Sequence, residues 1–317
     1  VSLQTGKTTI GNIRTEVNGI NAIQKYCNTN NINLEESFPS VNFMQKTIKQ
    51  TADKQKYFPI DYKDFEFRVN YKTEKKLLPK YDVVKSLVRN WKNSKKVFRY
   101  LKRFTFTNPD YPFKIDCSIV KSSGKNRNRM IPEYTVEKAN LFNNPPSYEI
   151  EIEVLPSAVA YGADYTFLKI REGFKIVLSG LQQTNFPTAY TKNDAILQEY
   201  MKLIHKSKAP IDRRIKTRDF IGPSSISLEL PDISPINQDA MFPNINLPYT
   251  VTEKADGIRK LLYIGSRGLM WLIDVNMNIQ FTGAKITNEE YYDSILDGEH
   301  VLHDKNGMFI DTYLAFD

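Results

Sequence analysis

The sequence predicts an α+β protein of two domains, an antiparallel β-barrel with a polar lumen followed by a second, largely β domain. Several segments between residues 64 and 155 alternate apolar with charged side chains, which suits strands of a barrel whose inside is polar. A stretch rich in Pro, Ser, Asp and Asn then separates them from a series of short strands and turns. The 317 residues also exceed the usual span of one core. We place the two domains at 1–207 and 208–317.

The elements follow from hydrophobic periodicity. Apolar residues at helical spacing predict helices over 17–27, 81–96 and 193–206. Alternation predicts strands in the first domain over 64–72, 98–106, 113–121 and 148–155. The connector is predicted over 207–247. Short strands are then predicted over 249–257, 259–265, 268–274, 278–283, 296–302 and 308–317.

Composition limits the class of protein and of partner. The net charge of +8 favours an anionic partner, with RNA, DNA and nucleotides as first candidates. The two cysteines have no metal-binding or redox spacing, so a reducing compartment is expected. Because no apolar run approaches the roughly 20 residues that span a bilayer, no membrane partner is predicted.

A strand with three glutamates is the first candidate site. In "YEIEIEVL", Glu149, Glu151 and Glu153 share one face, about 7 Å apart. Carboxylates so close repel one another unless something positive lies among them. One interpretation is an exposed amphipathic edge strand. The other is a site for Mg²⁺ or Mn²⁺, which prefer carboxylate oxygens.

The neighbouring strands favour the metal interpretation, because they also carry charged faces. Acidic residues would hold the ion, while basic residues would hold phosphate oxygens and stabilise charge on a transferred phosphoryl group. The pattern therefore predicts a metal-dependent phosphohydrolase in a charged tunnel. Its further candidate residues are Arg68, Glu74, Arg99, Arg103, Lys114 and Asp116.

The second candidate site is the K-x-D-G-x-R pattern of Lys254, Asp256 and Arg259 in "VTEKADGIRK". One interpretation is a charged surface hairpin, since Asp-Gly is an ordinary turn signal. The other is a lysine nucleophile that attacks the α-phosphorus of a nucleoside triphosphate, with pyrophosphate leaving. Such a lysine must be neutral, so its pKa has to fall through nearby cations or desolvation. Downstream, Glu299 could bind ribose hydroxyls and Phe316 could stack on a base.

These residues carry a resemblance to known families. "EKADGIR", "LDGEHV" and "YLAFD" resemble motifs I, III and IIIa of the covalent nucleotidyltransferases, which include mRNA guanylyltransferases and ATP- or NAD-dependent ligases. "YEIEIEVL" resembles the glutamate strand of the tunnel-type RNA triphosphatases. In this order they resemble the multifunctional mRNA capping enzymes of poxviruses, asfarviruses and yeast cytoplasmic linear plasmids.

The resemblance implies a fold and a role for each residue. The fold would be a triphosphate-tunnel barrel followed by part of an ATP-grasp-like nucleotidyltransferase domain. Lys254 would be the guanylylated lysine, with Asp256, Arg259 and Glu299 beside the ribose and phosphates and Phe316 against the guanine. Glu149, Glu151 and Glu153 would include the ligands of Mg²⁺ or Mn²⁺.

The same resemblance implies partners and missing parts. GTP and RNA with a 5′-triphosphate would be substrates, and a viral-type RNA polymerase and a methyltransferase would be partners in the host cytoplasm or the virion. A second acidic strand is expected before Val1, with Asp64 and Glu66 as the alternative within this chain. Motifs IV and V of the nucleotidyltransferase are expected after Asp317.

Two rival functions remain open. An ATP-dependent polynucleotide ligase uses the same lysine chemistry, but it does not account for the glutamate strand. A non-catalytic module that binds RNA or a polymerase would keep the fold and lose the activity.

Overall fold

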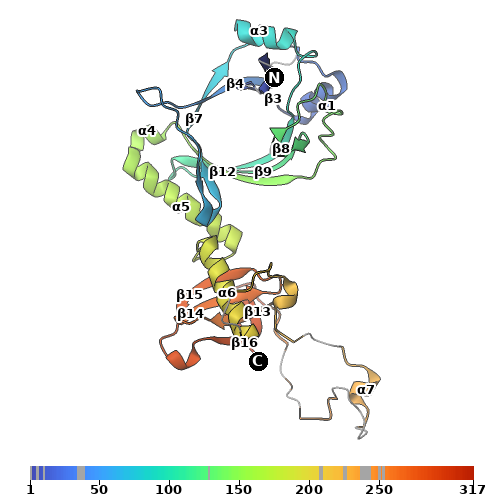
Figure 1. Ribbon diagram of the computed structural model, residues 1–317, viewed down its shortest axis with the longest axis vertical. Coiled ribbons are helices and arrows are strands. Elements are labelled where there is room, and N and C mark those ends of the chain that lie inside the picture. Colours follow the sequence, from blue (N-terminus) through green and yellow to red (C-terminus); the bar gives the residue numbers. More distant parts are fainter. Residues whose placement is uncertain are drawn as a thin grey trace. The chain divides into compact units, whose positions relative to one another are not determined.

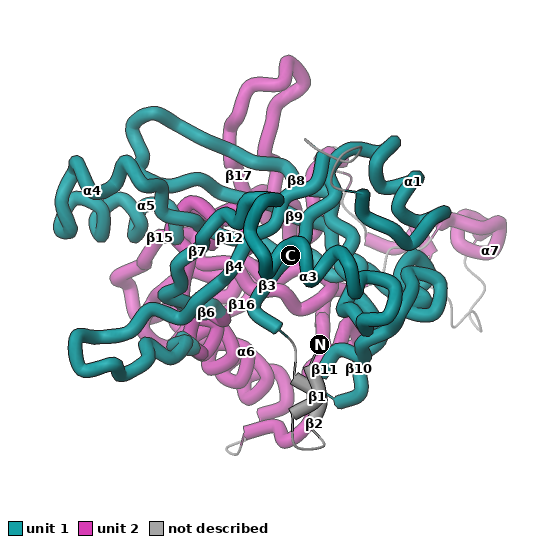
Figure 2. Tube along the Cα trace, turned by 90° about the horizontal axis from the view of Figure 1, so that it is seen from above, with its two compact units in different colours: residues 1–62, 67–174 teal, residues 63–66, 175–317 magenta. Residues whose placement is uncertain are grey.

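The computed structural model describes residues 2–4, 7–9, 11–33, 40–127, 129–206, 210–223, 227–235, 244–248, 251 and 254–317. The chain divides into two compact units (Figure 2). Unit 1 comprises Val1–Tyr62 and Phe67–Phe174, and unit 2 comprises Lys63–Glu66 and Lys175–Asp317. Among the described helices, none has the length and apolar character that crossing a bilayer requires.

Unit 1 contains two antiparallel sheets of three strands each, which curve toward each other in Figure 1. The first, in the order β3-β4-β7, consists of Ile13–Val17, Val41–Ile48 and Lys72–Leu77. The second, in the order β12-β9-β8, consists of Ser147–Val154, Phe113–Ser122 and Arg99–Thr107. The two-stranded sheets are β1 (Ser2–Gln4) with β2 (Lys7–Thr9), β5 (Ile60–Tyr62) with β6 (Phe67–Val69), and β10 (Lys125–Asn126) with β11 (Arg129–Met130). The predicted strands over 98–106, 113–121 and 148–155 are confirmed as β8, β9 and β12.

One face of the first sheet forms a hydrophobic core. Phe43 on β4 lies opposite Leu77 on β7, so the two side chains share a face, and both are buried. They cluster with Val84 and Trp91, from the segment of helix α3 (Asp82–Arg89), and helix α1 (Ile20–Thr29) contributes Tyr26. Because alternate residues of a strand point to opposite faces, the other face of this sheet is left for polar side chains.

The helices before residue 183 match the predictions only in part. The helix predicted over 17–27 is confirmed as α1, and the helix predicted over 81–96 is present but ends at Arg89. Two further helices were not predicted, α4 (Ala158–Tyr161) and α5 (Ala163–Gln182). Apolar side chains of α5 such as Phe167, Ile176 and Leu181 remain more than half exposed, so its sequence lacks the single buried stripe that identifies an amphipathic helix.

The continuous strand predicted over 64–72 is wrong. Residues Lys63–Phe65 form the 3₁₀ helix η1, and Glu66 has a φ of 52°, in the left-handed region and far from the values of regular strands. The chain therefore breaks before β6, and the charged strand that follows is β7, which starts at Lys72.

Unit 2 is built on a five-stranded antiparallel sheet in the order β15-β14-β13-β16-β17. Its strands are β13 (Ile258–Ile264), β14 (Leu269–Asp274), β15 (Ile279–Lys285), β16 (Ser294–His303) and β17 (Phe309–Ala315), with the 3₁₀ helix η3 (Glu289–Tyr291) before β16. The predicted strands of the second domain after residue 258 are thus confirmed.

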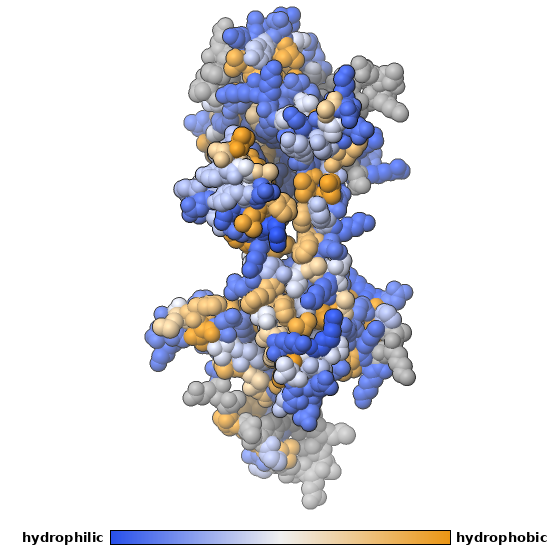
Figure 3. Space-filling model, turned by 90° about the vertical axis from the view of Figure 1, so that its left-hand side faces the viewer, coloured by the Kyte–Doolittle hydropathy of each residue, from blue (hydrophilic) through white to orange (hydrophobic). Residues whose placement is uncertain are grey.

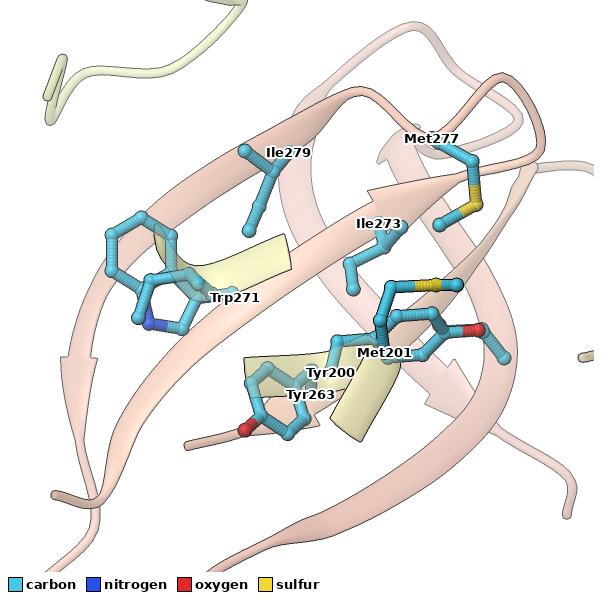
Figure 4. Packing of buried hydrophobic residues seen from close by; sticks show 9 residues of the cluster. Tyr200, Met201, Tyr263, Trp271, Ile273, Met277 and Ile279 are labelled. Carbon is cyan, nitrogen blue, oxygen red and sulfur yellow. The ribbon is translucent and has the colours of Figure 1, made fainter. Parts of the chain in front are cut away.

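Helix α6 (Tyr190–His205), which confirms the helix predicted over 193–206, packs on one face of this sheet. Tyr200 and Met201 of the helix meet Tyr263, Trp271 and Ile273 of the strands, and all five are fully buried (Figure 4). This core fixes β13 and β16, the two strands that carry the candidate residues of unit 2.

The predicted connector over 207–247 holds only short elements where the structure describes it. These are the 3₁₀ helix η2 (Thr217–Asp219) and the helix α7 (Leu230–Ile233). The strand predicted over 249–257 falls partly on 249–250 and 252–253, outside the described residues, and 254–256 have no regular structure.

Candidate functional site

Strand register gathers the charged residues of unit 1 on one face of the second sheet, which we call the inner face. Glu151 of β12 lies opposite Asp116 of β9, which lies opposite Thr105 of β8. The rows on either side pair Glu153 with Lys114, and Glu149 with Ser118 and Arg103. Because cross-strand partners share a face, the three predicted glutamates and their basic neighbours lie together as expected.

Each glutamate of the inner face forms an ion pair with a basic side chain of another strand. Arg99 lies 2.6 Å from Glu149. Arg103 lies 3.2 Å from Glu151, and Lys114 lies 3.1 Å from Glu153. The side chains of Glu151 and Glu153 remain about half exposed, so these carboxylates are open to a ligand.

Asp116 is the centre of this ion-pair network. Its side chain is fully buried and accepts a hydrogen bond of 2.6 Å from the Thr105 hydroxyl. Lys114 Nζ and Arg103 Nη1 lie 3.1 and 3.2 Å from Asp116 Oδ2. Burial raises the pKa of this carboxyl, but the Thr105 hydrogen bond and the charges of Lys114 and Arg103 outweigh burial and hold the pKa below its usual value.

The first sheet adds a second charged face. Lys46 of β4 pairs with Glu74 of β7, and Arg14 lies 2.6 Å from Glu16 on β3. Burial raises the pKa of Glu74, but Lys46, Arg14 and Lys114 together lower it below its usual value. Since Lys114 belongs to the inner face of the other sheet, its effect on Glu74 indicates that the two charged faces of unit 1 look toward each other.

Three residues named from the sequence lie apart from these two faces. Arg68 lies on the β5–β6 hairpin and forms a bidentate pair with Asp61, at 2.5 and 2.9 Å. Asp64 belongs to unit 2, where it accepts a hydrogen bond from Thr191 of α6, and Glu66 occupies the break before β6. The early break of the 64–72 strand explains why none of them reaches the inner face.

The donors on the inner face have the chemistry of a hard-cation site, since they are carboxylates. Within the described residues, however, no group of three or more Asp, Glu, His or Cys side chains lies close enough to hold an ion. Each carboxylate instead has a basic partner. Arg14, Glu16 and Lys46 were missed by the sequence analysis, although the alternation in "VNFMQKTI" could have revealed β4.

In unit 2, Lys254 lies just before β13 and its side chain is 82% exposed. Its Nζ donates a hydrogen bond of 3.1 Å to Asp256 Oδ1. This bond, the charge of Asp256 and the charge of Glu299 raise the pKa of Lys254. The expected fall in pKa is therefore absent from this arrangement, because the acidic neighbours of the amine hold its proton.

Arg259 does not provide the positive charge that would lower the pKa of Lys254, because Asp297 of β16 neutralises the charge of Arg259. Its guanidinium forms a bidentate pair with the carboxylate of Asp297. Asp297 is only 5% exposed. The pair lies against Phe220, whose ring centroid is 5.7 Å from Arg259 Cζ. Gly222 follows Phe220, and a Cβ there would lie 2.7 Å from Arg259 Nη2 and 2.9 Å from Asp297 Oδ2.

Register and one hydrogen bond bring Glu299 to the K-x-D-G-x-R segment. Glu299 lies opposite Arg259, and its Oε2 accepts a hydrogen bond of 2.8 Å from the Gly257 backbone N–H. A Cβ at Gly257 would lie 2.9 Å from the carbonyl oxygen of His300, which explains the glycine of the motif. Phe316 lies beside them: its N–H donates to the Asp297 carbonyl, and its side chain is half exposed. Glu299 thus lies against the K-x-D-G-x-R segment at the start of β13, the Phe316 backbone is hydrogen-bonded to Asp297 of β16, and the Lys254 side chain is hydrogen-bonded to Asp256.

A buried polar chain lies on the other face of the same strands. Lys260 Nζ donates to Gln280 Oε1 at 2.5 Å and lies 3.0 Å from His300 Nδ1. His300 Nε2 lies 2.7 Å from Asp311 Oδ1. Burial lowers the pKa of Lys260, while the charges of Asp274 and Asp311 raise it, and burial has the larger effect. Lys260 and Asp311 were not identified from the sequence.

Comparison with known proteins finds similarity for residues of the second unit. Residues 184–317 match the family described as mRNA capping enzyme, catalytic domain. The chain is also similar to a probable mRNA-capping enzyme of Acanthamoeba polyphaga mimivirus, with 23% identity over 214 residues. That alignment covers 68% of this chain and is longer than residues 184–317, so it includes part of the preceding sequence. The chain spans 15% of the length of this relative. No solved structure matches.

Proposed function

We propose that this chain carries out two steps of mRNA capping, with guanylyl transfer in unit 2 and removal of the RNA 5′ γ-phosphate in unit 1. One observation carries the proposal: Lys254 and Asp256 lie just before β13, at the point where Glu299 binds the Gly257 backbone opposite Arg259, within the region that matches the capping-enzyme catalytic domain. Phosphate-binding and base-stacking groups beside an accessible lysine are what transfer of a nucleotide through a lysine requires.

The proposed guanylyl transfer uses Lys254 as the nucleophile. Nζ of Lys254 attacks the α-phosphorus of GTP, a P–N bond forms, the P–O bond to the β-phosphate breaks and pyrophosphate leaves. The ammonium loses one proton before the attack and a second as the P–N bond forms; Asp256, 3.1 Å from Nζ, would accept one, and the departing pyrophosphate would accept the other. A β-phosphate oxygen of the RNA diphosphate end then attacks the same phosphorus, which breaks the P–N bond and restores the amine.

In unit 1 we propose hydrolysis of the RNA triphosphate between its two charged faces. Arg14, Lys46, Arg99, Arg103 and Lys114 offer cationic donors for phosphate oxygens. A water molecule would attack the γ-phosphorus, and the P–O bond to the β-phosphate would break. Mg²⁺ or Mn²⁺, held by Glu149, Glu151 and Glu153, would neutralise phosphate charge when bound. In the described arrangement, these carboxylates would first have to exchange their basic partners for the ion.

The two steps imply an order of events and a setting. A polymerase must supply triphosphate ends, unit 1 must produce diphosphate ends, and unit 2 must use them. A methyltransferase would act afterwards, in the host cytoplasm or the virion where such a viral enzyme would work. These partners and this location remain part of the proposal.

Labelling with α-³²P nucleotides tests the guanylyl-transfer step. The chain should retain label from GTP after denaturing electrophoresis. Lys254→Ala should lose it, whereas Lys285→Ala, which alters a lysine outside the site, should retain it. Label from ATP and not from GTP would support a polynucleotide ligase, and label from neither would support a non-catalytic module.

Phosphate release tests the first step separately. RNA with a γ-³²P-labelled 5′-triphosphate should lose inorganic phosphate in the presence of Mg²⁺ or Mn²⁺. Glu151→Ala should abolish this release, whereas Glu137→Ala, an exposed glutamate outside the inner face, should not. Equal release by both variants would contradict the assignment of unit 1.

A further inference from the structure

The second sheet of unit 1 has an outer face whose composition is opposite to that of its inner face. We define the outer face by the alternate residues of β8, β9 and β12 that point away from Asp116. By register these are Tyr100, Lys102, Phe104, Phe106, Phe113, Ile115, Cys117, Ile119, Lys121, Tyr148, Ile150, Ile152 and Val154. They include two lysines and no carboxylate, whereas the inner face carries four carboxylates.

Apart from Phe113, the aromatic side chains of the outer face are open to solvent. Tyr148 is 77% exposed, Phe106 60% and Phe104 50%. Helix α5 covers the sheet at Phe113, where a Cβ on Gly173 would lie 2.5 Å from the Phe113 ring, and Phe113 is buried. In the view of Figure 3, hydrophobic residues lie among hydrophilic ones on the surface of the molecule. A sheet normally buries its apolar face, so exposed aromatic residues here indicate a binding surface.

Positive charge accompanies these rings. Lys102 Nζ lies 5.6 Å from the centroid of the Phe104 ring. Lys121 Nζ donates to the carbonyl of Phe142, whose ring contacts the Tyr100 ring edge-on at 5.4 Å. The chain then leaves the end of β9 for the β10–β11 hairpin, which adds exposed basic side chains. These are Lys125, Arg127 and Arg129.

We propose that the outer face binds single-stranded RNA. Bases would stack on Phe104, Phe106 and Tyr148, and the phosphates would contact Lys102 and the basic β10–β11 hairpin. A sheet that combines exposed aromatic rings with lysines and lacks acidic groups has the features of a sequence-tolerant platform for single strands. Its charge is complementary to phosphate, which favours RNA over an acidic-rimmed protein interface or a second copy of this positively charged chain. The proposal rests on the proposed function only for the source of the RNA, the transcript being capped.

Fluorescence anisotropy with labelled oligouridine of about 15 nucleotides, bearing a 5′-hydroxyl, tests the outer face. The 5′-hydroxyl removes the triphosphate that the inner face would bind. We expect Tyr148→Ala and Phe104→Ala each to weaken binding by about 5-fold to 100-fold, because each removes a stacking ring. Phe58→Ala is the matched control, since Phe58 is 73% exposed but lies outside this sheet. Lys102→Ala should also reduce the slope of log affinity against log salt by about 0.7.

Two outcomes would overturn the proposal. Unchanged RNA affinity in both aromatic variants would show that the rings do not bind RNA. A variant that dissociates a dimer in sedimentation velocity, with RNA affinity unchanged, would assign the face to self-association. The proposed function fails separately: a chain that takes no label from GTP but loses RNA binding in Tyr148→Ala keeps the outer-face assignment and loses the capping assignment.

Discussion

Nζ of Lys260 lies 3.0 Å from Nδ1 of His300 inside unit 2, and the other ring nitrogen of His300 lies 2.7 Å from Asp311. A lysine ammonium can only donate, so this geometry is the one expected when the ring accepts at Nδ1 and carries its N–H at Nε2, toward the Asp311 carboxylate. The chain of contacts connects β13, β16 and β17, the strands that carry Arg259, Glu299 and the segment leading to Phe316.

We therefore expect His300→Leu to destabilise unit 2 by about 2 kcal/mol, since it leaves a buried amine and a carboxylate each without one partner. Urea unfolding followed by fluorescence would measure the loss. His303→Leu is the control, because His303 is exposed on the opposite face of the same strand. Equal effects of both variants would show that the buried chain adds nothing to stability.

Gly222→Ala tests how closely the loop approaches the Arg259–Asp297 pair. A methyl group at this position would collide with Phe220, Arg259 and Asp297. Displacing the guanidinium should reduce the rate of labelling from GTP by about 100-fold, while the chain stays folded. Gly265→Ala serves as control, because its Cβ would have no neighbour closer than 3.6 Å. Unreduced labelling in Gly222→Ala would contradict a role for Arg259 at the nucleotide.

Asp256→Asn should change the pH dependence of Lys254. Asp256 raises the pKa of the amine, so removing its charge should lower the pKa and make the amine reactive at lower pH. Acylation of the Lys254 peptide, followed by mass spectrometry across a pH series, would measure the shift. Asp212→Asn, at an exposed position of the connector, should leave the profile in place. A profile that does not move in Asp256→Asn would refute the ion pair in solution.

Asp116→Asn should destabilise unit 1 by about 2 kcal/mol. The change removes the negative charge from the buried centre of the network, so Lys114 and Arg103 keep charges that Asp116 no longer compensates. Thermal or urea unfolding at neutral pH would detect the loss, and Asp110→Asn, which alters an exposed turn residue, is the control. A variant as stable as the parent would show that the remaining glutamates compensate both cations.

The burial of Lys96 predicts that folding stability changes with pH in mild alkali. Burial lowers the pKa of its amine to about 8, while the unfolded chain keeps the ordinary value of 10.5. Above about pH 8 the unfolded state therefore binds more protons than the folded state, and stability should rise with pH toward 10.5. Lys96→Met should flatten this rise between about pH 8 and 9.5 in urea titrations, and Lys95→Met should not. An unchanged slope in Lys96→Met would assign the rise to another group.

Local patterns were enough to predict β8, β9, β12 and every strand of the sheet in unit 2, because alternation and turn residues are encoded over a few positions. They failed at Glu66, whose positive φ interrupts an alternating run. They also failed for α5, whose exposed apolar residues give no single stripe.

The candidate sites were predictable in their residues and less so in their contacts. Glu149, Glu151 and Glu153 share a face for purely local reasons, and so their clustering was foreseen. Which basic side chain each glutamate contacts depends on the register of β8 and β9, and the sequence does not reveal that register. The contact of Gly222 with Arg259 joins segments 37 residues apart and needs the fold of α6 and η2 to form.

The ion pairs of the inner face join four carboxylates to three basic side chains, so unit 1 should exchange one set of ions for another. Every basic side chain there already has a carboxylate partner. A polyphosphate therefore cannot bind without displacing carboxylates, and a divalent ion cannot bind without displacing basic side chains. A polyphosphate alone leaves the carboxylates without counter-ions and a divalent ion alone leaves the basic side chains without them, whereas the two together supply counter-ions to both sets. Unit 1 should therefore bind the polyphosphate and the divalent ion together, each raising the affinity for the other.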